Sequence, residues 1–227
     1  MKLAVATCWA YRDALLPFFY LLDKFWPTHP EVTIVTDEWC GDSYGADVYQ
    51  GGRKTWCQIL AGYAKEAEET ILLLQDDFFL TVPVQNDLVI HGLKEMYTYD
   101  AGCVRLYPCP GGVERYGDPY FQVVPNGERY RVSCQASLWK PSYLYKIVSK
   151  CHDHGEPSDF ETNGTVYSYQ LPEPVLAFKA DIRPLPLDYL CSAISRGLWE
   201  PAAIELCEKY HIPMDRSMRE VATPCLT

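Results

Sequence analysis

Two adjacent carboxylates, Asp76 and Asp77, follow the all-apolar residues 71–74, with only Gln75 between them. A short continuous apolar run is typical of a strand buried on both faces of a parallel sheet. Because neighbouring carboxylates repel each other, the pair requires a nearby cation or a raised pKa. Hard divalent cations such as Mg²⁺ or Mn²⁺ prefer carboxylate oxygens and often bind together with a diphosphate. The pair therefore predicts a metal site at a strand end, and the competing interpretation is one turn-capping Asp beside one solvated Asp.

The elements that precede this pair alternate between strands and helices. The apolar pattern predicts strands at residues 3–8, 32–36 and 71–74, and helices at residues 14–25 and 54–69. Such an order is typical of a parallel sheet covered by helices, where ligands bind beyond the carboxyl ends of the strands. Asp76 and Asp77 would lie at such an end.

The second half of the chain has a different pattern, with shorter strands between turn residues. We expect a Gly-rich loop at 41–52, a helix at 86–97, strands at 103–106, 120–124 and 130–138, and helices at 143–151, 187–195 and 201–210. No internal repeat or linker interrupts the pattern. The economical prediction is one α/β domain with an added antiparallel part.

Composition excludes several classes of protein. The 227 residues include 20 Lys and Arg against 30 Asp and Glu, a net charge of −10, and 48% are hydrophobic. Disorder and a coiled coil are excluded, and general nucleic-acid binding is disfavoured unless a local basic groove exists. The ten cysteines lie among apolar neighbours without a CxxC pair, which favours a reduced, cytoplasmic protein. No apolar run approaches the roughly 20 residues of a membrane span.

The segment around the acidic pair resembles nucleotide-sugar glycosyltransferases of the GT-A fold, in which a variant of the DxD motif follows the fourth strand. Residues 131–140 resemble the strand after the metal site, and residues 157–161 resemble the acidic motif that opens the acceptor helix. Residues 194–201 resemble the C-terminal G-x-W segment of capsule-type transferases. The resemblance implies a single GT-A-like, Rossmann-type domain over residues 1–227 with a mixed, mostly parallel sheet. Its nucleotide-sugar half would be residues 1–100 and its acceptor half residues 101–227.

The motif itself departs from the family pattern. It reads Gln75-Asp76-Asp77, so an amide stands where the family has its first acid. The resemblance then implies that Asp77 holds Mn²⁺ or Mg²⁺, while Asp76 meets the ribose or reaches the metal through water. This change would weaken the hold on the metal.

The resemblance implies metal-dependent transfer of a sugar from a nucleotide sugar, with a UDP-sugar favoured, to an acceptor hydroxyl. The acceptor would be a saccharide or a modified DNA base. Such a reaction needs a base within hydrogen-bond reach of that hydroxyl. Glu161 is the first candidate and Asp159 the second, and an inverting outcome follows if Glu161 is the base. The competing interpretation is that Glu161 caps a segment or pairs with a lysine.

The donor would lie over the first half of the sheet, near strand ends. Thr7 and Asp37 are candidates for the base or ribose, and Arg53 and Lys54 for the diphosphate. Each has an ordinary alternative as a turn residue, helix cap or solvated charge. Trp139 is a candidate for stacking on the acceptor, with core packing as its alternative. Trp56 is expected in the core.

Three other functions stay open. One is a phage-type DNA glycosyltransferase acting on hydroxymethylated bases, for which an interleaved set of aromatic and basic residues could track a nucleic acid. That set is Arg115, Tyr116, Tyr120, Arg129, Tyr130 and Arg131. Another is a non-catalytic protein that binds nucleotide sugars or glycans. A third, nucleotidyl transfer, usually has a Gly-rich basic loop near the N-terminus, and none follows Cys8.

Overall fold

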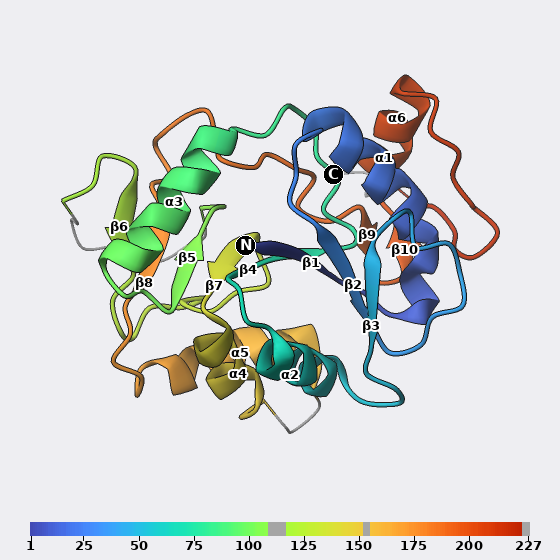
Figure 1. Cartoon of the computed structure of the whole chain (residues 1–227). Coiled ribbons are helices and arrows are strands. Elements are labelled where there is room, and N and C mark those ends of the chain that lie inside the picture. The colour runs from blue at the N-terminus through green and yellow to red at the C-terminus, as the bar shows by residue number, and fades with distance from the viewer. Residues whose placement is uncertain (109–116, 152–154, 224–227) are drawn as a thin grey trace.

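A mixed sheet of eight strands with helices on both faces organises the chain (Figure 1). The computed structural model describes residues 1–108, 117–151 and 155–223. The strands are β1 (Lys2–Ala6), β2 (Val32–Thr36), β3 (Asp47–Gln50), β4 (Ile71–Gln75), β5 (Cys103–Arg105), β6 (Phe121–Val123), β7 (Ser137–Trp139) and β8 (Val175–Phe178), with a separate hairpin of β9 (Ile194–Ser195) and β10 (Leu198–Trp199). The helices are α1 (Leu15–Phe25), α2 (Trp56–Glu66), α3 (Asn86–Thr98), α4 (Pro141–Val148), α5 (Pro157–Ser168) and α6 (Pro201–Lys209), preceded by the 3-10 turn Trp9–Ala14.

The strand order is β3-β2-β1-β4-β7-β5-β8-β6. The first four strands are parallel, and β7 runs antiparallel between β4 and β5. Ala6 at the end of β1 is level with Val35 of β2 and with Gln75 of β4. The residues that follow these three strands therefore meet at one edge of the sheet. The single α/β domain with a mostly parallel, mixed sheet confirms the predicted fold class.

Each face of the sheet carries its own hydrophobic core. Figure 1 shows α1, α3 and α6 on one face and α2, α4 and α5 on the other. Leu72 and Leu74 belong to the first core, whereas Ile71 and Leu73 belong to the second. Burial on both faces explains why β4 is continuously apolar.

Two predicted segments differ from the structure. The Gly-rich stretch 41–52 contains β3, an exposed edge strand whose polar residues give no continuous apolar run. The helix predicted over residues 187–195 is wrong. The segment is extended, and its backbone forms hydrogen bonds with the residues that follow β4. The Leu190 N–H donates to the Phe79 carbonyl at 3.0 Å, and the Ala193 N–H donates to the Asp77 carbonyl at 2.9 Å.

The acceptor-side strands are shorter than predicted. Of the predicted strand at 130–138, only Ser137 and Leu138 belong to β7, and the remaining residues form turns and bends. The strand β8 was not predicted, although its four residues are all buried between β5 and β6. In the described part of the chain no disulfide joins the cysteines, and none of its helices has the length and apolar character needed to cross a membrane.

Candidate functional site

A cavity of about 560 Å³ opens at the carboxyl ends of β1, β2 and β4. It brings together six of the nine side chains that the sequence singled out: Thr7, Asp37, Lys54, Asp76, Asp77 and Glu161. They come from three strand ends, the start of α2 and the second turn of α5. This is the edge where ligands bind in open α/β sheets.

Asp76 lies at the base of the cavity and is only 6% exposed. Thr7, at the end of β1, donates a hydrogen bond from Oγ1 to Asp76 Oδ2. Burial, followed by the neighbouring charge of Asp77, raises the pKa of Asp76 well above its ordinary value, and the Thr7 bond opposes this only partly. A cation at this position would remove the unfavourable charge.

Asp77 is held by the segment that was expected to be a helix. Ser192 Oγ donates to Asp77 Oδ2 at 2.6 Å, and the Ala193 N–H donates to the Asp77 carbonyl. Burial raises the pKa of Asp77, and the Ser192 bond counteracts part of this rise. No sequence pattern points to Ser192, because its position depends on pairing between chain segments more than 100 residues apart.

The donor set of this cavity fits a hard divalent cation that a substrate helps to hold. Asp76 and Asp77 offer carboxylate oxygens, and both have raised pKa values that a bound cation would lower. Among the described residues, neither belongs to a group of three potential metal-binding side chains with suitable spacing. Mg²⁺ is commonly bound by one or two carboxylates together with substrate phosphates and water, which is the pattern this pair could supply.

Gln75, the amide in place of the first motif acid, faces the same cavity. Its Nε2 atom is buried and has no hydrogen-bond partner among the described residues. A buried donor without a partner costs about 1–3 kcal/mol. The amide therefore leaves an unsatisfied donor beside the cavity, which a carboxylate at this position would not.

Asp37 organises the loop after β2. Its Oδ1 accepts hydrogen bonds from the backbone N–H of Trp9 and of Glu38, both at 2.8 Å. Burial alone would raise the pKa of Asp37, but these bonds outweigh it and lower the pKa. Oδ2 has no hydrogen-bond partner within the described ranges, so the ionised carboxylate keeps one oxygen for a ligand.

The amino end of α2 forms another wall of the cavity. Thr55 caps the helix by accepting the Gln58 N–H, and Gln58 returns a bond to the Thr55 N–H. Lys54, Thr55 and Trp56 all line the cavity. A helix amino end and a lysine both favour an anion such as a phosphate.

Glu161 and Asp159 have different surroundings although both lie on α5. Glu161 lines the cavity, and its Oε1 accepts the Cys134 N–H at 2.9 Å. Asp159 accepts the Glu156 N–H at 3.4 Å as part of the helix cap and does not line the cavity. The geometry therefore favours Glu161 over Asp159 for chemistry in the cavity.

Two further predicted site residues lie away from it. Arg53 is exposed and pairs with Glu38 at 3.2 Å. Trp139 is fully buried and packs against Tyr143 and Phe160. Stacking of Trp139 on an acceptor is corrected to core packing, because β7 is an inner strand. Trp56, expected in the core, is instead half-buried in the cavity wall.

The aromatic-basic set proposed for nucleic-acid contact does not form one surface. Arg131 is 3% exposed and donates to the carbonyls of Val124 and Ser168 and to the Tyr143 hydroxyl. Arg115 and Tyr116 lie outside the described residues. Arg131 therefore serves the core and is not available to a nucleic-acid backbone.

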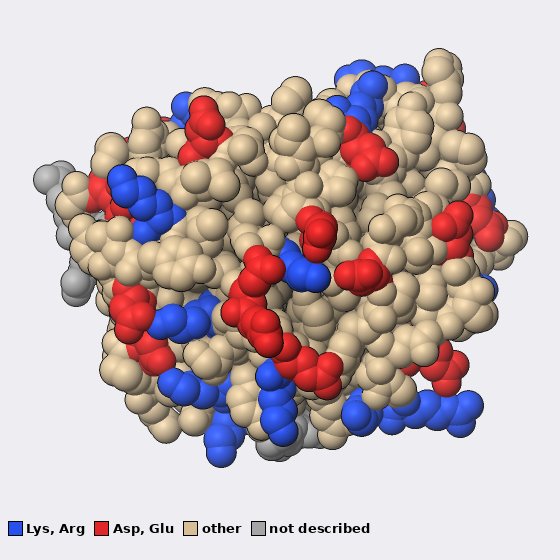
Figure 2. Space-filling view, viewed as in Figure 1, with Lys and Arg blue, Asp and Glu red and all other residues tan. Residues whose placement is uncertain are grey.

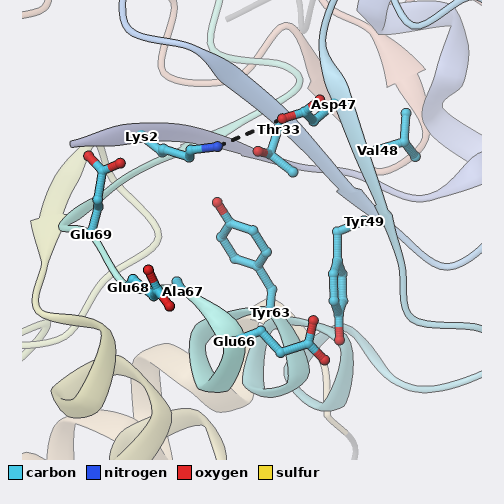
Figure 3. Close-up of a pocket in the computed structure, with 10 residues that line it drawn as sticks. All are labelled: Lys2, Thr33, Asp47, Val48, Tyr49, Tyr63, Glu66, Ala67, Glu68 and Glu69. Carbon is cyan, nitrogen blue, oxygen red and sulfur yellow. Dashed lines mark ion pairs between the residues drawn. The ribbon is translucent and has the colours of Figure 1, made fainter.

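A second pocket of about 520 Å³ lies at the opposite, amino edge of the sheet (Figure 3). Its wall carries Asp47, Glu66, Glu68 and Glu69, and Lys2 pairs with Asp47 at 3.8 Å. Figure 2 shows acidic side chains gathered in the middle of this face. Apart from Lys2, the charged side chains in the wall of this pocket are carboxylates. Their negative charge disfavours binding of a diphosphate.

Comparison with known proteins adds support for the fold. No family model matches the chain, and no curated protein matches it in sequence. Among solved structures, it is similar to 2-C-methyl-D-erythritol 4-phosphate cytidylyltransferase from Thermus thermophilus, with 15% identity, a TM-score of 0.51 and coverage of 93% of this chain and 98% of that one. Residues 1–349 of S. aureus TarS give 13% identity, a TM-score of 0.50 and coverage of 80% and 58%. At these identities the likeness is one of fold, consistent with a Rossmann-like GT-A domain.

Proposed function

We propose that this protein is a metal-dependent glycosyltransferase that moves a sugar from a nucleotide sugar to an acceptor hydroxyl. One observation carries the proposal: a cavity at the carboxyl ends of the parallel strands holds the Asp76–Asp77 pair, a helix amino end and the carboxylate of Glu161. The similarity to a cytidylyltransferase fold supports a nucleotide-derived donor.

The donor is a UDP-sugar in this proposal, bound mainly by residues 1–100. Thr7 and Asp37 contact the base or ribose, and Lys54 with the amino end of α2 contacts the diphosphate. Gln75 supplies its buried amide donor to a donor-substrate oxygen. Asp77, and Asp76 directly or through water, would hold Mn²⁺ or Mg²⁺, and such an ion neutralises charge on a departing diphosphate.

In the proposed transfer step, the reacting groups lie between residues 1–100 and residues 101–227. Glu161 accepts the proton of the acceptor hydroxyl, whose oxygen forms a bond to the anomeric carbon. The bond from that carbon to the diphosphate breaks, and its electron pair leaves with the nucleoside diphosphate. Attack opposite the leaving group inverts the anomeric centre. Residues 101–227 supply the acceptor side, with Trp56 at the border to stack on a sugar ring or a base.

Donor binding is tested first. The thermal midpoint is measured with UDP-, GDP-, CDP- and TDP-sugars, each with and without Mn²⁺. A ligand at 100 times its Kd stabilises the fold by about 2.7 kcal/mol. Stabilisation by a UDP-sugar that needs Mn²⁺ supports the proposal. A metal-independent response to a glycan alone would favour a binding protein without turnover.

Turnover is tested with matched neighbours. Glu161→Gln is expected to lower kcat by about 10²- to 10⁴-fold, the usual contribution of general base catalysis, while Asp159→Asn stays near wild type. Lys54→Gln should weaken donor binding, whereas Arg53→Gln, outside the cavity, should not. Release of a nucleoside diphosphate identifies glycosyl transfer, whereas release of pyrophosphate from a nucleoside triphosphate would show nucleotidyl transfer and refute the proposal.

A further inference from the structure

A second group of potential metal ligands lies far from the cavity. His91 and Glu95 are on α3, and Asp118 precedes β6. The three ligand atoms, one from each side chain, all lie within 4.8 Å of one another. Three strands separate β6 from β4 in the sheet, so this group is independent of the Asp76–Asp77 pair.

Local structure brings the three side chains together on rigid supports. His91 and Glu95 are four residues apart on one helix, so they share a face. The His91 ring packs against Phe121 and meets the edge of Tyr120. Its Nε2 lies 2.7 Å from Asp118 Oδ2. Ligand side chains that are held by packing in this way are pre-positioned for an ion.

Asp118 is held in the same manner. Its Oδ1 accepts the N–H groups of Tyr120 at 2.7 Å and Phe121 at 2.8 Å, so Oδ2 faces His91. Asp118 therefore offers one carboxylate oxygen in a fixed orientation.

Both carboxyl groups of this cluster lie in the protein interior. Glu95 is 7% exposed and Asp118 is 9% exposed. Two carboxylates whose oxygens lie this close attract a divalent cation more strongly than either would alone. Lys179 donates to the Asp118 and Pro119 carbonyls, away from the carboxylate.

We propose that His91 Nε2, a Glu95 carboxylate oxygen and Asp118 Oδ2 form a Zn²⁺ site that fastens α3 to the edge strand β6. One imidazole and two carboxylates suit Zn²⁺ better than Mg²⁺, which prefers oxygen ligands throughout. A tetrahedral ion with bonds of about 2.1 Å keeps its ligand atoms about 3.4 Å apart, so His91 and Asp118 separate by several tenths of an ångström on binding. The His91 side chain is 29% exposed, which gives the ion a path from solvent.

Isothermal titration of the full chain with Zn²⁺ tests the site, carried out under reducing conditions in an Asp77→Asn background that removes the cavity's own metal position. Glu95→Gln and His91→Gln are each expected to lose one bound Zn²⁺ or to bind it at least about 10-fold more weakly. His29→Gln is the matched control, because His29 pairs with Asp23 at 3.1 Å without a third ligand among the described residues. Unchanged Zn²⁺ stoichiometry and affinity in both test variants would overturn the proposal.

A second measurement leaves all three proposed Zn²⁺ ligands in place. Diethyl pyrocarbonate modification of the chain that carries only Asp77→Asn is followed peptide by peptide with mass spectrometry. Zn²⁺ is expected to slow modification of His91 at least about 10-fold while leaving His29 unchanged. Equal slowing of both histidines, or of neither, would overturn the site. Mg²⁺ at the same concentration should protect neither.

Discussion

Replacing Asp76 with asparagine is expected to stabilise the metal-free protein at neutral pH. The amide keeps the volume of the side chain and an oxygen that accepts the Thr7 hydroxyl. It removes the buried charge and the repulsion from Asp77 that raise the pKa of Asp76. A buried carboxylate that is costly for the fold and lies at a strand end is typical of a functional position.

The pH dependence has a definite sign. Because the folded protein holds the Asp76 proton more tightly than the unfolded chain does, the stability linked to Asp76 is fully present below pH 3.8. It is lost as the pH rises through the raised pKa. A rise of one unit in a pKa is worth about 1.36 kcal/mol. For a chain of this size, 1 kcal/mol moves Tm by about 2–4 °C.

The assay compares Tm of wild type and Asp76→Asn between pH 4 and pH 8 with a chelator present. The difference should be near zero at pH 4 and should reach at least about 2 °C in favour of the variant at pH 8. Asp181→Asn, at an exposed position, serves as the control for loss of one charge. A variant no more stable than wild type at pH 8 would refute the claim that Asp76 carries an uncompensated charge.

Three further predictions concern the supports of the site. Arg219→Gln should lower the free energy of unfolding in urea by about 3–5 kcal/mol, because the fully buried Asp13 carboxylate loses both of its 2.6 Å bonds from the Arg219 guanidinium. A loss below about 1 kcal/mol would contradict this. Trp139→Ala should lower the free energy of unfolding by about 3–5 kcal/mol, because the ring is fully buried. Trp139→Phe should leave the acceptor KM unchanged. A raised KM in the Phe variant would show that the Trp139 ring contacts the acceptor. Gly155→Ala should lower both Tm and donor affinity. Gly155 has a φ of +70°, and the added Cβ would lie 2.1 Å from Thr55 Oγ1 in the cap of α2. Unchanged donor affinity would show that this cap does not position the donor.

The parallel strands β1, β2 and β4 could be predicted from sequence because their signals are local. Residues 71–74 are continuously apolar since both faces of β4 are covered. Asp76 and Asp77 follow a strand that ends beside β1, so both had to reach the carboxyl edge. Thr7 and Asp37 were found by the same argument, and the structure brings them to one cavity.

What could not be predicted depends on contacts between distant segments. Ser192 reaches Asp77 only because an extended chain pairs with residues after β4. Trp56 follows the apolar periodicity of its helix, yet it lies at the first turn, where the core gives way to the cavity. Arg131 was a candidate for contact with a nucleic acid, but its donors satisfy carbonyls inside the protein. Charge and spacing alone do not distinguish these environments.

Binding of UDP measured by isothermal titration, with and without Mn²⁺, tests the central claim most directly. For wild type, Mn²⁺ is expected to tighten UDP binding at least about 10-fold, which corresponds to about 1.4 kcal/mol. In Asp77→Asn the affinities with and without Mn²⁺ should be equal, while Arg53→Gln should behave as wild type. A wild-type affinity for UDP that does not change with Mn²⁺ would contradict a metal–diphosphate site at Asp77. An equally large effect of Mn²⁺ in Asp77→Asn would contradict it as well.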